Sequence, residues 1–192
     1  MTKLTFTFFA FLLSMAIGLA QPGTPDLNFD ADGALTIDFF GSNDFGYTIA
    51  PYGNDFIVAG ITDSPGTRFG AFARLNGDGS YDTQFANTGK RAVNVPGGQA
   101  EISGLAVQND NRIIAVGSTG SLDHGLIFRL NPNGSVDGGF GGGFIQHQQA
   151  GNDVEYYYGV ALQPDGKIVV CGTTGIVNTR DVIVLRLNTN GT

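Results

Sequence analysis

The stretch that decides the fold is Gly159–Thr192, GVALQPDGKIVVCGTTGIVNTRDVIVLRLNTNGT, because two looser copies of it lie upstream. Matching residues in the copies are Gly60, Gly117 and Gly172, then Arg74-Leu75, Arg129-Leu130 and Arg186-Leu187. An Asp-x-x-Phe motif opens each unit, at Asp26, Asp82 and Asp137. The copies recur every 55 to 57 residues. Self-similarity at a period of this size is typical of solenoids and propellers.

Within the third copy the local chemistry predicts β structure throughout. An apolar run at Gly159–Gln163 and a β-branched run at Lys167–Cys171 flank the turn Pro164-Asp165-Gly166, which predicts a hairpin. Asp181–Leu187 predicts a third strand that is apolar on both faces. Since a strand with two apolar faces is buried on both, we expect this sheet to pack between neighbouring sheets.

A fourth strand is expected at the start of each unit, at Leu35–Phe39, Ala92–Val95 and Phe144–His147. Four short strands per unit are the content of one propeller blade. We therefore predict an all-β fold, a β-propeller-like array of four-stranded antiparallel blades with about three units, 25–80, 81–135 and 136–192. Propellers close with about four to eight blades. The array is thus expected to be incomplete, either the N-terminal part of a longer protein or an open array that pairs with something.

The pattern resembles the delta-60 repeat of secreted bacterial proteins. The resemblance rests on Asp-x-x-Phe, on Gln-Pro-Asp-Gly-Lys-Ile-Val-Val-Cys-Gly at 163–172 and on Arg-Leu-Asn-x-Asn-Gly at 186–191, and it covers residues 25–192. The first copy departs from it, because Pro51–Asp55 replaces the Gln-Pro-Asp-Gly-Lys turn. The resemblance implies a propeller-like architecture, an extracytoplasmic setting and further repeats or a C-terminal sorting domain. It implies no catalytic motif.

Residues 1–20 have the composition of a secretory signal peptide. Lys3 precedes an apolar run from Leu4 to Ile17, and small residues lead to a cleavage site before Gln21. We therefore predict a secreted or cell-surface protein whose repeat region is 21–192. After cleavage, no stretch reaches the roughly 20 apolar residues that a membrane helix needs, so no membrane span is predicted.

Charge and cysteine content exclude two further classes. Seventeen acidic against ten basic residues give a net charge of −7, which argues against a nucleic-acid partner. The single cysteine, Cys171, excludes an intramolecular disulfide. It takes the strand position that Ala59 and Val116 hold in the other copies, so a small apolar side chain is favoured over a nucleophile.

Polar residues that recur in every unit are interpreted as structural. Arg74, Arg129 and Arg186 recur with Asp82, Asp137 and Asp26, and bridges between strands or blades are favoured over a ring of ligand-binding charges. The turns at 76–80, 131–135 and 188–192 and the acidic loop 26–33 are typical of Asn-Gly and Asp-Gly turn chemistry. No cofactor or metal site is predicted, and weak calcium binding at these Asn/Asp turns stays open.

Features found in only one unit are better candidates for function. Tyr156, Tyr157 and Tyr158 form a possible binding surface for a sugar or a partner protein. The glycines of 138–143 predict a flexible turn, since the lysine and helix of a phosphate loop are missing. His124 and His147 lack the spacing of metal ligands and are expected to be solvated.

The sequence thus favours a non-enzymatic scaffold or interaction module whose partner is an unknown protein or carbohydrate at the cell surface. Two alternatives stay open. One is an extracytoplasmic hydrolase or lyase on a propeller, with acids drawn from scattered positions: Asp63, Asp123, Asp153 and Glu155. The other is a spacer that holds a C-terminal functional domain.

Overall fold

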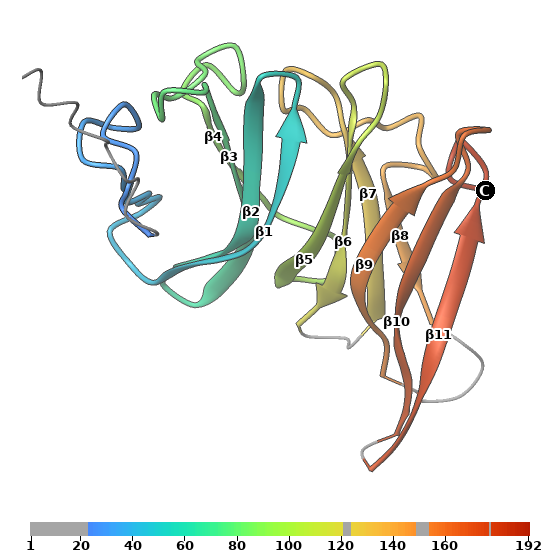
Figure 1. The fold of residues 1–192 in the computed structure, drawn as a ribbon. Coiled ribbons are helices and arrows are strands. Elements are labelled where there is room, and N and C mark those ends of the chain that lie inside the picture. Colours follow the sequence, from blue (N-terminus) through green and yellow to red (C-terminus); the bar gives the residue numbers. More distant parts are fainter. Residues whose placement is uncertain (1–22, 121–123, 149–153, 177) are drawn as a thin grey trace, which may run out of the picture.

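The computed structural model describes residues 23–120, 124–148, 154–176 and 178–192. These residues form eleven strands and no helix, arranged in three antiparallel sheets that stand side by side (Figure 1). The all-β, propeller-type fold predicted from the repeat is therefore confirmed. Because this part of the chain holds no helix, it holds none that could cross a membrane.

Blade 1 consists of β1 (Asp44–Tyr52), β2 (Asp55–Ser64), β3 (Thr67–Leu75) and β4 (Lys90–Val93), hydrogen-bonded in that order. Blade 2 repeats the arrangement with β5 (Ala100–Val107), β6 (Ile113–Thr119), β7 (His124–Leu130) and β8 (Phe144–His147). Blade 3 consists of β9 (Tyr156–Leu162), β10 (Ile168–Ile176) and β11 (Thr179–Leu187).

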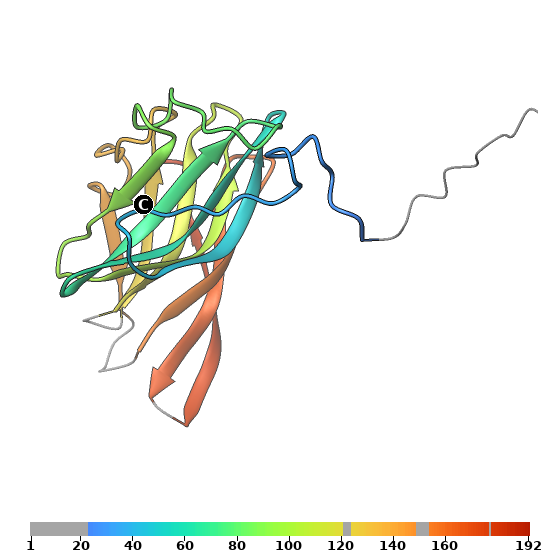
Figure 2. The same ribbon diagram turned by 90° about the vertical axis from the view of Figure 1, so that its left-hand side faces the viewer.

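The fourth strand of each complete blade comes from the start of the following sequence unit. Residues 90–93 pair with β3 and residues 144–147 pair with β7, so the Asp-x-x-Phe loops at Asp82 and Asp137 lie between the third and fourth strands of one blade. The prediction of a strand at Leu35–Phe39 is wrong, because this segment has no sheet to pair with. It runs extended across the open face of blade 1, where Leu35, Ile37 and Phe39 are half-buried and alternate with exposed residues (Figure 2).

Turn glycines set the hairpins. Gly166 has a φ of 81° in the predicted turn between β9 and β10, and Gly53 has a φ of 66° at the same place in blade 1. Because Gly53 supplies the positive φ, the β1–β2 hairpin forms although the Gln-Pro-Asp-Gly-Lys sequence is missing there. Pro51↔Phe56 and Tyr52↔Asp55 are paired at its end.

The glycine that marks each copy is required by a close backbone approach. A β-bulge in the first strand of each blade brings a carbonyl oxygen against the second strand. A Cβ on Gly117 would lie 1.8 Å from the Glu101 oxygen, and Gly60 and Gly172 meet the same obstacle at 1.8 and 1.9 Å. Only glycine fits these three positions without moving the strand.

Apolar side chains fill the space between the blades. Between blades 1 and 2, Phe72 and Phe128 meet edge to face at 5.9 Å within a cluster that includes Ile57 and Ile102. Between blades 2 and 3, Val116 and Ile127 pack against Val170 and Leu187. Strands β6 and β7 are consequently buried on both faces, as the repeat predicts. Strand β11 differs from this prediction, because its outer face is exposed among the described residues.

Candidate functional site

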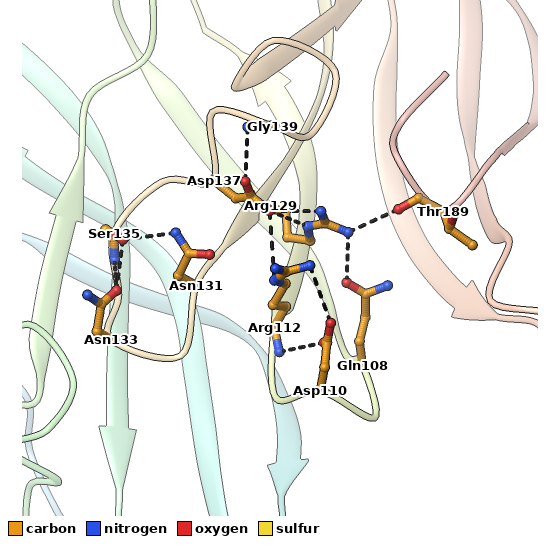
Figure 3. Close-up of polar contacts among 10 residues, drawn as sticks. All are labelled: Gln108, Asp110, Arg112, Arg129, Asn131, Asn133, Ser135, Asp137, Gly139 and Thr189. Atoms are coloured by element: carbon orange, nitrogen blue, oxygen red, sulfur yellow. Dashed lines mark hydrogen bonds and ion pairs between the residues drawn. The ribbon is translucent and has the colours of Figure 1, made fainter.

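The repeated arginine forms the polar link between neighbouring blades. Arg129 is the penultimate residue of β7, and its Nε and Nη2 atoms lie 2.8 and 2.7 Å from Oδ2 of Asp137 in the loop that follows (Figure 3). Its Nη1 atom donates to the carbonyl of Thr189 in blade 3 at 3.0 Å. The guanidinium also lies over the Phe140 ring at 4.6 Å. One side chain thus holds its own loop and the next blade together.

Blade 1 contains the same link. Arg74 Nε lies 2.7 Å from Asp82 Oδ2, and Arg74 Nη1 donates to the carbonyl of Pro132 in blade 2 at 2.6 Å. Both arginine side chains are almost fully buried, so each charge is compensated where it is desolvated. The structural interpretation of Arg74 and Arg129 is confirmed.

The predicted pairing of Arg186 with Asp26 is wrong. Arg186 is exposed, and it makes no ion pair with Asp26. Asp26 instead accepts hydrogen bonds from Asn28 at the far end of the molecule. Asp82 and Asp137 each follow their arginine by eight residues. Asp26 instead precedes Arg186 in the chain, so the two do not form the same pair.

This network lowers the pKa of the Asp137 carboxyl group. Burial raises its pKa, but hydrogen bonds from Arg129 and from the Gly139 N–H, with the charges of Arg129 and Arg112, lower it below its ordinary value. The loop 138–143 was expected to be a flexible turn. Gly141, Gly142 and Gly143 have positive φ, and the Gly139 N–H donates to Asp137 at 2.9 Å, so part of the loop serves the link.

A groove opens beside this network, between the loops of blades 2 and 3. We call it the loop groove. It has a volume of about 630 Å³. Its polar lining includes Gln108, Asp110, Arg112, Gln163 and Asn190, next to Arg129 and Thr189 of the link. Gln108 Oε1 accepts from Arg129 at 3.3 Å, and Arg112 lies 3.4 Å from Asp110 and 3.9 Å from Asp137. The groove therefore presents amide, carboxylate and guanidinium groups on a fixed backbone.

The corresponding groove between blades 1 and 2 is arranged differently. It has a volume of about 520 Å³ and includes Tyr52. The Tyr52 ring covers Arg74 at 4.7 Å, and its hydroxyl donates to the carbonyl of Asn111 at 3.2 Å. The Tyr52 ring thus connects blade 1 to blade 2. In the loop groove no tyrosine does this, and Gln108 and Arg112 line the wall instead. Sequence analysis did not single out either residue, because their positions become a site only when the blades stack.

The Asn-rich turns satisfy their own hydrogen bonds. Asn131 Nδ2 donates to Ser135 Oγ at 3.0 Å, and Asn133 Oδ1 accepts from both the backbone and the hydroxyl of Ser135. Among the described residues no cluster of acids, histidines or cysteines has the arrangement of a metal site. Calcium binding at these turns stays a prediction.

The three tyrosines do not form one exposed row. Tyr157 is completely buried, so it must be removed from the predicted binding surface; Tyr156 is partly buried and Tyr158 is 53% exposed. Neighbouring strand residues point to opposite faces, which explains the burial of the middle ring. Gly125 makes room for that ring, since a Cβ there would lie 2.4 Å from it. A binding role for Tyr158 stays a prediction.

Tyr157 belongs to a buried polar cluster that sequence analysis missed. Its hydroxyl lies 3.0 Å from Glu155 Oε2 and 2.9 Å from His147 Nδ1, and His147 lies 2.7 Å from the same carboxylate oxygen. Glu155 is fully buried. Burial and the Glu155 carboxylate raise the pKa of Tyr157. His147 is therefore hydrogen-bonded between blades, and its side chain is still 34% exposed, so the expectation that it is solvated holds only in part. The other histidine, His124, is partly buried on β7.

The structure describes two of the four acids on which an enzymatic alternative would depend. Asp63 lies 3.3 Å from Arg68, which also approaches Glu101 at 3.7 Å in blade 2. Glu155 contacts β8 through His147. Asp123 and Asp153 lie outside the described residues. The two described acids are thus engaged with different partners.

Cys171 lies in β10, as predicted, but its side chain is exposed rather than buried. It shares the outer face of blade 3 with Val184, its cross-strand partner. Its counterpart Val116 is completely buried by blade 3. The burial expected for this position therefore depends on a neighbouring blade.

One family model matches the chain. It is described as a domain of unknown function (DUF5122) beta-propeller, and it matches residues 108–140 and 163–192. The two segments cover corresponding parts of blades 2 and 3, namely β6 and β7 in one and β10 and β11 in the other. No curated protein and no solved structure matches the chain. The match supports a propeller-type repeat, and the more specific resemblance to the delta-60 repeat stays a prediction.

Proposed function

We propose that the chain is a non-enzymatic interaction module of a secreted or cell-surface protein, and that it binds carbohydrate in the loop groove. The observation that carries the proposal is a difference between the arginines of the repeat and Arg112. Arg74 and Arg129 are engaged in links between blades, whereas Arg112, with a side chain 40% exposed, faces the groove.

The lining of the loop groove suits a ligand rich in hydroxyl groups. The amide group of Gln163 offers donors and an acceptor, and the amide nitrogen of Asn190 offers donors, since its oxygen accepts from Thr192. Asp110 adds acceptors and Arg112 adds donors. Such convergent polar groups on fixed loops fix the orientation of a ligand. The exposed ring of Tyr158 offers a second, separate place for a sugar face.

The proposed location rests on residues 1–20, whose charge and apolar run are those of an export signal. Expression in a bacterium with fractionation tests it. We expect the protein to accumulate outside the cytoplasm with Gln21 as its first residue. Recovery of an uncleaved chain from the cytoplasm would contradict it.

Binding is tested with an immobilised panel of neutral and acidic polysaccharides. We expect at least one of them to bind, and Arg112→Ala to weaken that binding by about tenfold, the equivalent of roughly 1.4 kcal/mol. Arg91→Ala is the matched control, since Arg91 is an exposed arginine of β4 outside the groove. Absence of binding to the whole panel, or equal binding by Arg112→Ala, would refute carbohydrate recognition in this groove.

A further inference from the structure

The charges of the loop groove cancel one another. Arg112 lies between two carboxylates, with Nη1 3.4 Å from Asp110 and Nε 3.9 Å from Asp137 (Figure 3). Arg129 pairs with the same Asp137 at 2.7 Å. Two guanidinium groups thus face two carboxylates. A ligand without charge leaves these pairs intact, whereas a ligand carboxylate would have to displace Asp110 from Arg112 and lie beside it.

The charges around the groove keep this balance. On the hairpin of blade 3, Asp165 and Lys167 pair with each other at 2.7 Å. The chain as a whole carries a net charge of −7. Because a negatively charged protein repels a polyanion until salt screens the charges, the approach of an acidic polymer is disfavoured.

The guanidinium group of Arg112 keeps its hydrogen-bond donors free for a ligand. Its two side-chain contacts are ion pairs at 3.4 and 3.9 Å, and among the described residues its side chain donates no hydrogen bond. Its backbone N–H donates to Asp110 Oδ1 at 3.2 Å, which fixes the two residues relative to each other. Since a guanidinium presents its N–H groups in a planar fork, Arg112 can donate to neighbouring oxygen atoms of one ligand.

The groove also contains an acceptor that lacks a donor. The Oε1 atom of Gln163 is buried, and within the described part of the chain it accepts no hydrogen bond. A buried acceptor without a donor costs free energy. Because the terminal torsion of glutamine is soft, a small rotation turns this oxygen toward a ligand. A hydroxyl group can donate to it, whereas an ionised carboxylate has no proton to donate.

Adjacent hydroxyl groups of a sugar match the pair formed by Asp110 and Arg112. The pair places an acceptor, Oδ2, and a donor, Nη1, 3.4 Å apart. Both side chains are accessible, at 55% and 40% exposure. Because a hydroxyl group both donates and accepts, one hydroxyl can donate to Asp110 while its neighbour accepts from Arg112. An isolated hydroxyl group would use only one half of the pair.

The neighbouring groove between blades 1 and 2 lacks this pair. Asp55 stands there at the position of Arg112, five residues before the repeat glycine. Among the described residues that line this groove, Arg74 is the sole cation, and it is almost fully buried in its link with Asp82. The combination of an exposed guanidinium with a carboxylate therefore distinguishes the loop groove from its counterpart.

We propose that the loop groove selects neutral sugars by their adjacent hydroxyl groups, and that Asp110 and Arg112 recognise these groups. Asp110 accepts from one hydroxyl, Arg112 donates to the next, and Gln163 accepts from a further one. Asp110 also disfavours uronic acids, because it repels a second carboxylate. This inference rests on the proposed function, since it names the class of carbohydrate that the same groove takes.

A set of immobilised polysaccharides tests the selectivity. Dextran and mannan are neutral and keep adjacent hydroxyl groups free. Polygalacturonate keeps them but is acidic, and curdlan is neutral but has no adjacent pair free along its chain. We expect the purified protein to bind dextran or mannan about tenfold or more tightly than the other two. Equal or tighter binding to polygalacturonate or curdlan would overturn the inference and leave carbohydrate recognition standing, whereas binding to none of them would refute both.

Asp110→Asn separates the charge of this side chain from its shape. We expect it to weaken binding to the preferred neutral polymer by about tenfold, and to strengthen binding to polygalacturonate at low ionic strength. Asp55→Asn is the matched control, because it makes the same change on the corresponding hairpin of the neighbouring groove. An unchanged ratio of the two affinities in Asp110→Asn, or the same change of ratio in Asp55→Asn, would overturn the role of Asp110.

Gln163→Met tests the buried acceptor. We expect about threefold to tenfold weaker binding to the neutral polymer, because the variant loses one hydrogen bond to a hydroxyl group. Its melting temperature should not fall, since the oxygen that it removes has no donor among the described residues. Circular dichroism shows that each variant is folded. Wild-type affinity in this variant would overturn the contact assigned to Gln163.

Discussion

Blades 2 and 3 carry nearly the same pattern of residues in different surroundings. Val116, Ile127 and Arg129 of blade 2 are buried because blade 3 covers them. Their counterparts Cys171, Val184 and Arg186 share one face of blade 3 and are exposed. The comparison shows that the repeat specifies the blade, whereas stacking decides which of its faces becomes core.

The largest difference between the blades is expected at the arginine. Arg129→Ala leaves the Asp137 carboxylate with only the more distant Arg112 charge and removes the contact with Thr189. We expect a loss of about 3 to 5 kcal/mol in the free energy of unfolding. Arg186→Ala is the matched control and should change it by less than about 0.5 kcal/mol. Urea unfolding at low protein concentration measures both; comparable losses would contradict the assignment.

A second comparison concerns the apolar face. Ile127→Ala removes a side chain that is fully buried between blades 2 and 3, and should lower the free energy of unfolding by about 2 to 5 kcal/mol. Val184→Ala removes a side chain that is 65% exposed. It should have an effect below about 0.5 kcal/mol. If Val184→Ala were as damaging as Ile127→Ala, the outer face of blade 3 would have to be covered.

The charge of Asp137 is expected to make a smaller contribution, which depends on pH. The folded protein holds the pKa of Asp137 below its ordinary value of 3.8, so its contribution is complete above that pH and is lost as the pH falls through the folded-state pKa. Asp137→Asn should therefore be less stable than the wild type at pH 6, and the two should converge toward pH 2. Melting temperatures across this range measure it.

The control for the pH experiment is Asp165→Asn. Asp165 pairs with Lys167 on the exposed turn of blade 3, where water screens the interaction. We expect its melting curve to follow that of the wild type at every pH. A constant difference between Asp137→Asn and the wild type down to pH 2 would show that the carboxylate charge does not contribute.

The sequence predicted what depends on one unit alone. The hairpins follow from turn glycines such as Gly166 and from β-branched strands such as Lys167–Cys171, because both act through local backbone preferences. The glycine of each copy was also visible, although its cause, the carbonyl opposite Gly117, was not. Local chemistry therefore accounts for the strands and for the period.

Features that arise between units were not predictable from the pattern. His147, Glu155 and Tyr157 converge only because blade 3 packs on blade 2, and their spacing in the sequence has no recognisable meaning. Leu35–Phe39 has the composition of a strand but needs a neighbouring edge to become one. The wrong pairing of Arg186 with Asp26 has the same origin, since the period alone does not tell which blade supplies a partner.

Hydrogen exchange of the backbone amides distinguishes β7, which has a strand on each side, from β11, whose outer edge has no described partner. We expect slow exchange in β7. We expect fast exchange at the outer edge of β11, where no described strand pairs. Equal protection of β7 and β11 would contradict the difference between a strand with a partner on each side and one that has a described partner on one side alone.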